Sequence, residues 1–160
     1  MKRSIFAISA VPTGRLFIMP RPSPERLSEV MAAYRSHRVD VVVSLLEPAE
    51  ARKLGLENEA QACEAASMRF IQFPIRDMGL PQSDTFATQV EELVGALSAG
   101  QGVAVHCRAG IGRSGTMTCC ILKKLGHSAA ASMDLVSKAR GLTVPETDEQ
   151  RDFIMRFETD

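Results

Sequence analysis

The sequence predicts an α/β fold, with a central, mostly parallel sheet of about five strands flanked by helices. Short apolar segments rich in β-branched residues alternate along the chain with segments whose apolar residues recur at helical spacing. Residues 39–46 are almost continuously apolar, which is typical of a strand covered on both faces. The chain has 160 residues, of which 45% are hydrophobic and 24% charged, and this suits a single domain spanning 1–160.

The chain begins with two predicted strands, residues 4–9 and 15–19, on either side of a Pro12-Thr13-Gly14 turn. Ser23-Pro24-Glu25 then predicts a helix start, because Ser is a common N-cap and Pro fits the first helical position. This helix should extend to about residue 37. Its apolar face is formed by Leu27, Val30, Met31 and Tyr34.

Residues 39–46 and 69–75 are the next two strands, and 48–55 and 57–67 are helical or irregular connections. Ser83 or Asp84 should cap the following helix, which Gly100 ends. That helix presents Phe86, Val90, Leu93, Val94 and Leu97 at helical spacing. The remaining predicted elements are a strand at 102–105 and helices at 116–125, 128–140 and 148–157, the second of these starting at Ser128.

The segment from His106 to Ser114 has the sequence His-Cys-Arg-Ala-Gly-Ile-Gly-Arg-Ser between a strand and a helix. Its two glycines tolerate the backbone angles that turn successive N–H groups inward around an anion. The N-terminus of the helix adds a positive dipole end, which stabilises a thiolate at Cys107. Arg113 supplies a planar fork that matches two oxygens of a tetrahedral dianion. The segment therefore predicts a nucleophilic cysteine within an oxyanion-binding loop.

This pattern resembles the signature of the protein tyrosine phosphatase superfamily, in which Cys, five residues, Arg and Ser or Thr follow a His. All of these positions match here, and residues 107–113 are called the signature loop below. The resemblance implies the phosphatase fold and a phosphocysteine intermediate formed by Cys107, without a metal or another cofactor. It also implies a set of phosphate-binding residues, namely Arg108, Ala109, Gly110, Ile111, Gly112 and Arg113.

Asp77 is the expected general acid, because displacing an alkoxide or phenoxide requires a proton donor. It lies after a strand and upstream of Cys107. The surrounding motif, Pro-x-x-Asp-x-x-x-Pro, resembles the compact dual-specificity branch of the family. An Asp beside Gly also commonly stabilises a turn. Asp84 is the alternative acid, although it is better placed as a helix cap.

Three further residues are expected to assist. Ser114 can donate a hydrogen bond to the Cys107 sulfur, or cap the helix, or do both. His106 is, in the resembling family, a buried residue that holds the loop. Thr147-Asp148-Glu149-Gln150 reads as a capping box, yet together with Arg140-Gly141 it also resembles a family motif whose Gln positions the hydrolytic water. The sequence Val144-Pro145 differs from the Pro-Gly sequence that usually follows the Arg in that motif.

The expected activity is hydrolysis of phosphotyrosine, and also of phosphoserine or phosphothreonine, in a phosphorylated protein. Ala109 and Ile111 stand where phosphoinositide phosphatases often carry lysines, which argues against a highly charged lipid head group. Tyr34 is the only tyrosine and falls in a predicted helix, so the tyrosine-bearing loop that deepens the pocket of strict phosphotyrosine phosphatases in the resembling superfamily is not expected here. Two alternatives stay open: a non-catalytic phosphopeptide-binding module, and a sulfurtransferase-like or arsenate reductase-like enzyme with a Cys-x5-Arg loop.

Nineteen basic and nineteen acidic residues give zero formal net charge, so no nucleic-acid or membrane partner is expected. The protein is also expected to be a monomer. Four cysteines without zinc-type spacing, one of them a proposed thiolate, indicate a reducing compartment and a cytoplasmic location. Cys119 and Cys120 should pack as small apolar residues. Cys63 is either buried in the same way or a reversible disulfide partner of Cys107.

Overall fold

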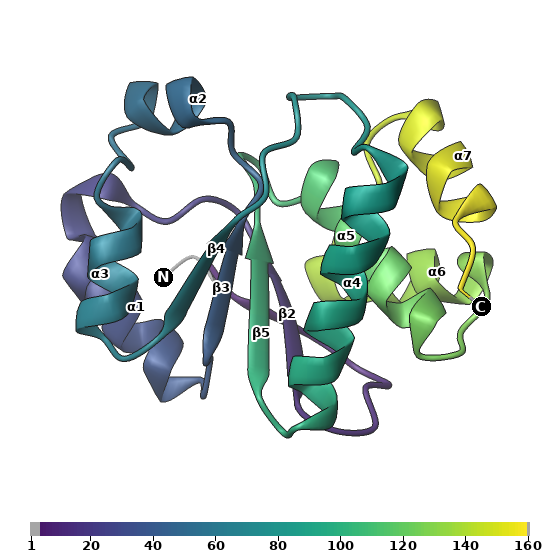
Figure 1. The fold of residues 1–160 in the computed structure, drawn as a ribbon, viewed down its shortest axis with the longest axis horizontal. Coiled ribbons are helices and arrows are strands. Elements are labelled where there is room, and N and C mark those ends of the chain that lie inside the picture. Colours follow the sequence, from purple (N-terminus) through teal and green to yellow (C-terminus); the bar gives the residue numbers. More distant parts are fainter. Residues whose placement is uncertain (1–3, 160) are drawn as a thin grey trace.

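A computed structural model describes residues 4–159, so both predicted domain limits, 1 and 160, lie just outside it. A five-stranded sheet with the order β1-β2-β5-β3-β4 is flanked by helices on both faces (Figure 1). The pairs β2–β5, β5–β3 and β3–β4 are parallel, and β1–β2 is antiparallel. The mixed α/β fold predicted from the sequence is therefore confirmed.

The strands are β1 (Phe6–Ile8), β2 (Arg15–Met19), β3 (Val41–Ser44), β4 (Arg69–Gln72) and β5 (Gly102–His106). β3 and β4 end earlier than predicted, at Ser44 and Gln72. The N–H groups of Phe73 and Ile75 still donate to the carbonyls of Ser44 and Leu45, so the two departing segments stay paired.

The helices are α1 (Leu27–Ser36), α2 (Pro48–Lys53), α3 (Glu59–Ala65), α4 (Ser83–Ser98), α5 (Arg113–Lys124), α6 (Ala129–Arg140) and α7 (Asp148–Arg156), with a 3₁₀ turn, η1, at Pro24–Arg26. In Figure 1, α1 and α3 cover one face of the sheet and α4 to α7 the other. Within residues 4–159, no helix is both long enough and apolar enough to cross a membrane.

Of the four predicted caps, one is wrong, one is correct in position only, and two are confirmed. Ser23 is the N-cap residue of the η1 turn, with Pro24 and Glu25 after it as predicted, but its hydroxyl donates to the Glu25 carboxylate, and α1 starts only at Leu27. α4 begins at Ser83 itself after an extended Gln82, so neither Ser83 nor Asp84 is its N-cap. By contrast, Ser128 accepts from the Ala131 N–H. The capping box at the start of α7 also forms.

Alternate residues of the central strands face opposite layers, which explains their nearly continuous apolar sequence. Val103 and Val105 pack in the core under α4 and α5, whereas Ala104 belongs to the core under α1 and α3. Cys107 lies in the first core and Cys63 in the second. Because the sheet separates them, Cys63 does not act as a disulfide partner of Cys107, and its prediction as an ordinary buried residue is confirmed.

The carboxyl ends of the parallel strands are level with one another. Met19 and Ser44 are both in register with His106, and Ser44 is also in register with Gln72. The segments that follow β2, β3, β4 and β5 therefore converge at one edge of the sheet, where sites of α/β proteins commonly form.

Candidate active site

The signature loop leaves β5 at this edge and runs directly into α5. Gly110 has φ +74°, and a Cβ there would lie 2.5 Å from the Met19 carbonyl oxygen, so the close approach to β2 requires glycine. α5 begins at Arg113, earlier than the predicted Thr116. The unpaired N–H groups of its first turn therefore lie directly beside the loop, where a helix N-terminus favours an anion.

Cys107 follows β5 at one end of this loop, and Ser114 follows the other end as the second residue of α5. Their sulfur and hydroxyl oxygen are 3.2 Å apart, so the Ser114 hydroxyl can donate to a thiolate. The N-cap of α5 is Gly112, and the alternative role of Ser114 as a cap is therefore wrong. Both side chains are buried, with Cys107 3% exposed.

The Arg113 side chain is almost completely buried, with 1% of it exposed. Its two terminal nitrogens each donate to one oxygen of Glu50, at 2.8 Å, and Nη1 also donates to the Ile75 carbonyl at 2.8 Å. This bidentate pair fixes the plane of the guanidinium. Hydrogen bonds from Arg113 in turn hold the pKa of the Glu50 carboxyl below its ordinary value.

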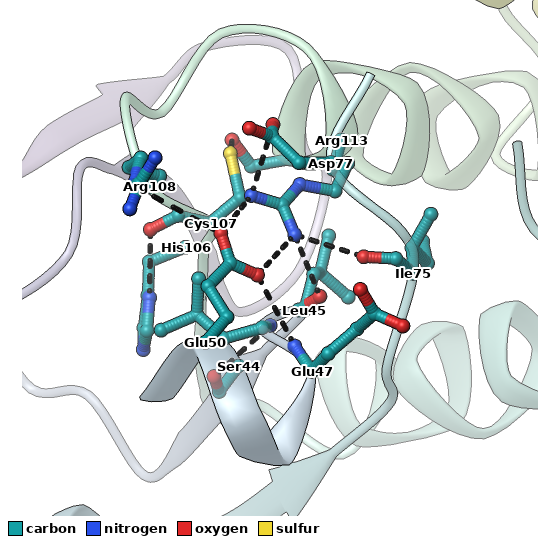
Figure 2. A network of polar contacts seen from close by, with 12 residues as sticks. Ser44, Leu45, Glu47, Glu50, Ile75, Asp77, His106, Cys107, Arg108 and Arg113 are labelled. Atoms are coloured by element: carbon teal, nitrogen blue, oxygen red, sulfur yellow. Dashed lines mark hydrogen bonds and ion pairs between the residues drawn. The ribbon is translucent and has the colours of Figure 1, made fainter. Parts of the chain in front are cut away.

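Sequence reasoning missed Glu50, because nothing in a stretch read as a helical or irregular connection indicates a partner 63 positions away. Its signal is visible only in three dimensions. α2 starts directly after β3, so it sits over the carboxyl edge of the sheet, where Glu50 reaches back to the loop (Figure 2).

Asp77, the predicted general acid, reaches the same guanidinium from another side. Its Oδ1 lies 3.2 Å from Nη2 of Arg113, and 49% of its side chain is exposed. Figure 2 shows the Cys107 sulfur and the Asp77 carboxylate together on one side of the guanidinium, with Glu50 on the other. Asp84, the alternative acid, instead lines a hollow on α4 with Phe153 and Arg156.

His106 is buried, as predicted, and it joins the loop to a carboxylate that the sequence did not reveal. Its Nε2 is 2.6 Å from an oxygen of Glu59, whose side chain is 3% exposed, and its Nδ1 is 3.2 Å from the Cys107 carbonyl oxygen. Glu59 begins α3, in a stretch whose charge pattern gave no hint of burial. The pair anchors the first peptide group of the signature loop.

Gln150 performs the predicted capping function and also lies against the loop. Its Oε1 accepts from the N–H groups of Glu146 and Thr147, at 3.1 Å each. Its Nε2 is buried without a hydrogen-bond partner among the described residues. A Cβ added at Gly112 would lie 3.0 Å from that Nε2, so the amide donor stands next to the signature loop.

The fold and the Cys-x5-Arg loop define a protein of the tyrosine phosphatase type, and comparison with known proteins gives the family. Residues 19–127 match the family model described as "Polymorphic toxin system, DSP-PTPase phosphatase". The chain therefore belongs to this family of dual-specificity and tyrosine phosphatase-like domains.

The curated relatives are much longer proteins. The chain is 32% identical over 120 residues to bovine protein tyrosine phosphatase domain-containing protein 1, a match that covers 69% of this chain and 15% of the relative. The zebrafish (Danio rerio) protein of the same name is 28% identical over 138 residues, which cover 80% of this chain and 19% of the relative.

Solved structures share the fold over nearly the whole chain. Kinase associated phosphatase with its catalytic cysteine replaced by serine superposes with a TM-score of 0.86 at 20% identity, covering 98% of this chain and 94% of that one. Tk-PTP in its active form has a TM-score of 0.78 at 25% identity, covering 99% and 98%. PTPMT1 in complex with PI(5)P has a TM-score of 0.74 at 22% identity, covering 89% and 88%.

Proposed function

We propose that the protein is a cysteine-dependent phosphatase that hydrolyses phosphotyrosine, and also phosphoserine or phosphothreonine, in protein substrates through a phosphocysteine intermediate. The observation that carries this proposal is the convergence on Arg113. One buried guanidinium, fixed in its plane by Glu50, faces both the Cys107 loop and the Asp77 carboxylate.

In the first step the Cys107 thiolate attacks phosphorus, and the S–P bond forms as the bond to the leaving oxygen breaks. Protonated Asp77 gives its proton to that oxygen. Arg113 and the loop N–H groups stabilise the equatorial oxygens, over which the transition state spreads its charge.

In the second step a water attacks phosphorus and gives its proton to Asp77, now acting as the base. The S–P bond breaks, phosphate leaves, and the Ser114 hydroxyl donates to the restored thiolate. Gln150 is placed to hold the attacking water, because its buried amide donor stands beside the loop. Positive charge at the phosphate comes from Arg113 and the helix N-terminus, so this scheme needs no metal.

The composition of the signature loop favours protein substrates over phosphoinositides, and the position of Tyr34 favours dual specificity. The loop carries Ala109 and Ile111, which add no positive charge for a second or third phosphate. Tyr34 is buried in α1 and 1% exposed, so it does not form a wall around the substrate ring. A shallow site of this kind would accept short and long phosphorylated side chains alike.

The two alternatives predict different residues at the site. A non-catalytic phosphopeptide-binding module has no need of a nucleophile and an acid that both adjoin the same arginine. Sulfurtransferase-like and arsenate reductase-like enzymes do not require a proton donor placed like Asp77. The presence of Cys107, Arg113 and Asp77 in one constellation supports a phosphatase in preference to both.

The first prediction tests this function directly with an aryl phosphate such as p-nitrophenyl phosphate. The wild type should release phosphate in the presence of EDTA. Cys107→Ser should abolish turnover while still binding tungstate, since the loop amides remain. Arg113→Lys should lose about 10²-fold or more of kcat/KM, since a point charge cannot make two parallel bonds. Cys119→Ala is the matched control for replacing a buried thiol.

Activity in Cys107→Ser, or loss of wild-type activity in EDTA, would contradict the mechanism. Phosphopeptides and phosphoinositide vesicles, compared under the same conditions, identify the substrate class. Faster release from the vesicles would contradict the proposed protein substrate and leave the chemistry intact.

A further inference from the structure

The signature loop binds an anion only if its N–H groups point inward, and the carbonyl partners show how this is enforced. A trans peptide bond places its C=O and N–H on opposite sides. A carbonyl held on the outside of the loop therefore holds the N–H of the next residue on the inside.

Two of these carbonyls have partners in the elements around the loop. The Cys107 carbonyl lies 3.2 Å from Nδ1 of His106. The Arg108 carbonyl accepts from the Arg21 N–H at 3.1 Å, just beyond β2. These contacts set the directions of the N–H groups of Arg108 and Ala109.

The next two carbonyls are held by a single side chain, that of Arg140 at the end of α6. Its Nη2 donates to the Ala109 carbonyl at 3.0 Å, and its Nε donates to the Gly110 carbonyl at 3.1 Å. The peptide groups concerned carry the N–H groups of Gly110 and Ile111, in the part of the loop that contains both of its glycines.

Arg140 is itself held in place for this contact. Its guanidinium carbon lies 4.5 Å from the centre of the Phe6 ring on β1, a cation–π geometry. Gly141 follows in the left-handed conformation, φ +77°, and ends α6 directly beyond it. The side chain thus reaches the loop from a helix end whose position is fixed by the sheet.

We propose that Arg140 is a positioning residue for the signature loop. It holds two peptide groups of the loop with their N–H bonds toward the phosphate. The inference rests on the proposed function, in which the signature loop binds phosphate. Arg140 acts through the backbone of Ala109 and Gly110. A lysine cannot replace it, because one ammonium on a flexible stem does not span two carbonyls with a fixed fork.

The test measures anion binding separately from turnover, by calorimetric titration of the full chain with tungstate. Arg140→Ala should bind tungstate roughly 10-fold or more weakly. Its kcat/KM should fall at least in proportion, because loop N–H groups that point away from the phosphate no longer stabilise the charge of the transition state. Arg140→Lys should resemble Arg140→Ala. Lys138→Ala, an exposed residue on the same helix, is the matched control and should bind like the wild type.

Chemical rescue supplies a readout that a purely stabilising role would not move. Guanidinium chloride at low, non-denaturing concentration should restore part of the tungstate affinity of Arg140→Ala and leave the wild type unchanged. Phe6→Leu retains the guanidinium but removes the ring beneath it, so it should weaken tungstate binding less than Arg140→Ala does. This variant keeps the inference testable if removal of Arg140 prevents folding.

Tungstate affinity equal to that of the wild type in Arg140→Ala, or in both Arg140→Lys and Phe6→Leu if Arg140→Ala does not fold, would overturn the inference. That result differs from failure of the proposed function, in which the wild type binds tungstate but hydrolyses no phosphate ester.

Discussion

At the scale of single residues, the four cysteines differ in what surrounds their sulfurs. Burial raises the pKa of Cys63 and of Cys119 to about 12, and it raises that of Cys120 further, so these thiols stay protonated. Cys107 instead shares its surroundings with the Ser114 hydroxyl and the loop donors. The chain thus contains one thiol placed for chemistry and three placed for packing.

Asp77 and a bound phosphate would share one partner, the Arg113 guanidinium. In the structure the Asp77 carboxylate pairs with Arg113, the same guanidinium that is proposed to bind the phosphate. A dianionic substrate competes for that guanidinium and brings negative charge close to the carboxylate. Displacement from Arg113 would leave the Asp77 carboxyl free to turn toward the leaving oxygen, where the proposed general acid is needed.

The second prediction is that Asp77→Asn will slow the enzyme according to the leaving group. Phenyl phosphate should lose about 10²-fold to 10⁴-fold of kcat, the range for general acids, and p-nitrophenyl phosphate much less, since its phenolate leaves without a proton. Tungstate should bind at least as tightly as before, because Asp77 no longer competes for Arg113. Asp84→Asn is the control and should leave both rates unchanged. An equal loss on both esters in Asp77→Asn would mean that the acid lies elsewhere.

At the scale of elements, the sequence predicts best where the physical signal is local. The apolar runs of β2, β3 and β5, the Ser128 cap and the Thr147–Gln150 capping box all depend on residues within a few positions of one another. The signature loop is predicted for the same reason, since its spacing is itself the signal. These features could be read from the chain alone.

The missed features join residues that are far apart in the chain. Glu50 reaches Arg113 and Glu59 reaches His106 across 63 and 47 positions, and both glutamates come from short helices with ordinary charge patterns. The sequence indicates Arg140 only as part of a tail motif, whereas in the structure it reaches the loop across 30 positions. The hydrophobic periodicity of the sequence does not predict such contacts, because they depend on the order of the strands in the sheet and on which strand each loop follows.

The third prediction separates the two roles of Gln150, the cap of α7 and the positioning of water. Gln150→Glu keeps a carbonyl-type oxygen for the Thr147 N–H, as in a Ser/Thr-x-x-Glu box, but removes the amide donor beside the loop. It should remain folded and accumulate phosphoenzyme in rapid-quench experiments, because the second step slows. Thr147→Ala should cost about 1 kcal/mol of stability and leave the second step unchanged. Wild-type hydrolysis of phosphocysteine in Gln150→Glu would restrict Gln150 to capping.

At the scale of the whole molecule, Arg113 and Glu50 join segments that the sheet alone leaves separate. Arg113 starts α5, Glu50 lies on α2, and the same guanidinium donates to the Leu45 and Ile75 carbonyls beyond β3 and β4. One ion pair therefore ties the helix behind the loop to the chain leaving two strands. Loss of this ion pair should therefore lower the free energy of unfolding of the whole domain as well as the rate of hydrolysis.

The fourth prediction follows from the lowered pKa of Glu50, which hydrogen bonds from Arg113 keep below the ordinary value of 4.5. A carboxyl whose pKa is lower in the folded state contributes stability above its unfolded pKa and loses it as the pH falls through the folded value. Glu50→Gln should therefore lower the free energy of unfolding at neutral pH, by about 1.5–3 kcal/mol for a hydrogen-bonded charged pair. The difference from the wild type should shrink as the pH falls below about 4.5.

Urea unfolding of both proteins at a series of pH values from neutral to acid measures this difference directly. The exposed Glu57→Gln is the control and should follow the wild type throughout. A constant deficit of Glu50→Gln at every pH would show that its side chain contributes through packing and not through its charge. A deficit that fades with acid, together with weakened tungstate binding at neutral pH, would show that one ion pair both orients the phosphate-binding arginine and couples the site to the stability of the fold.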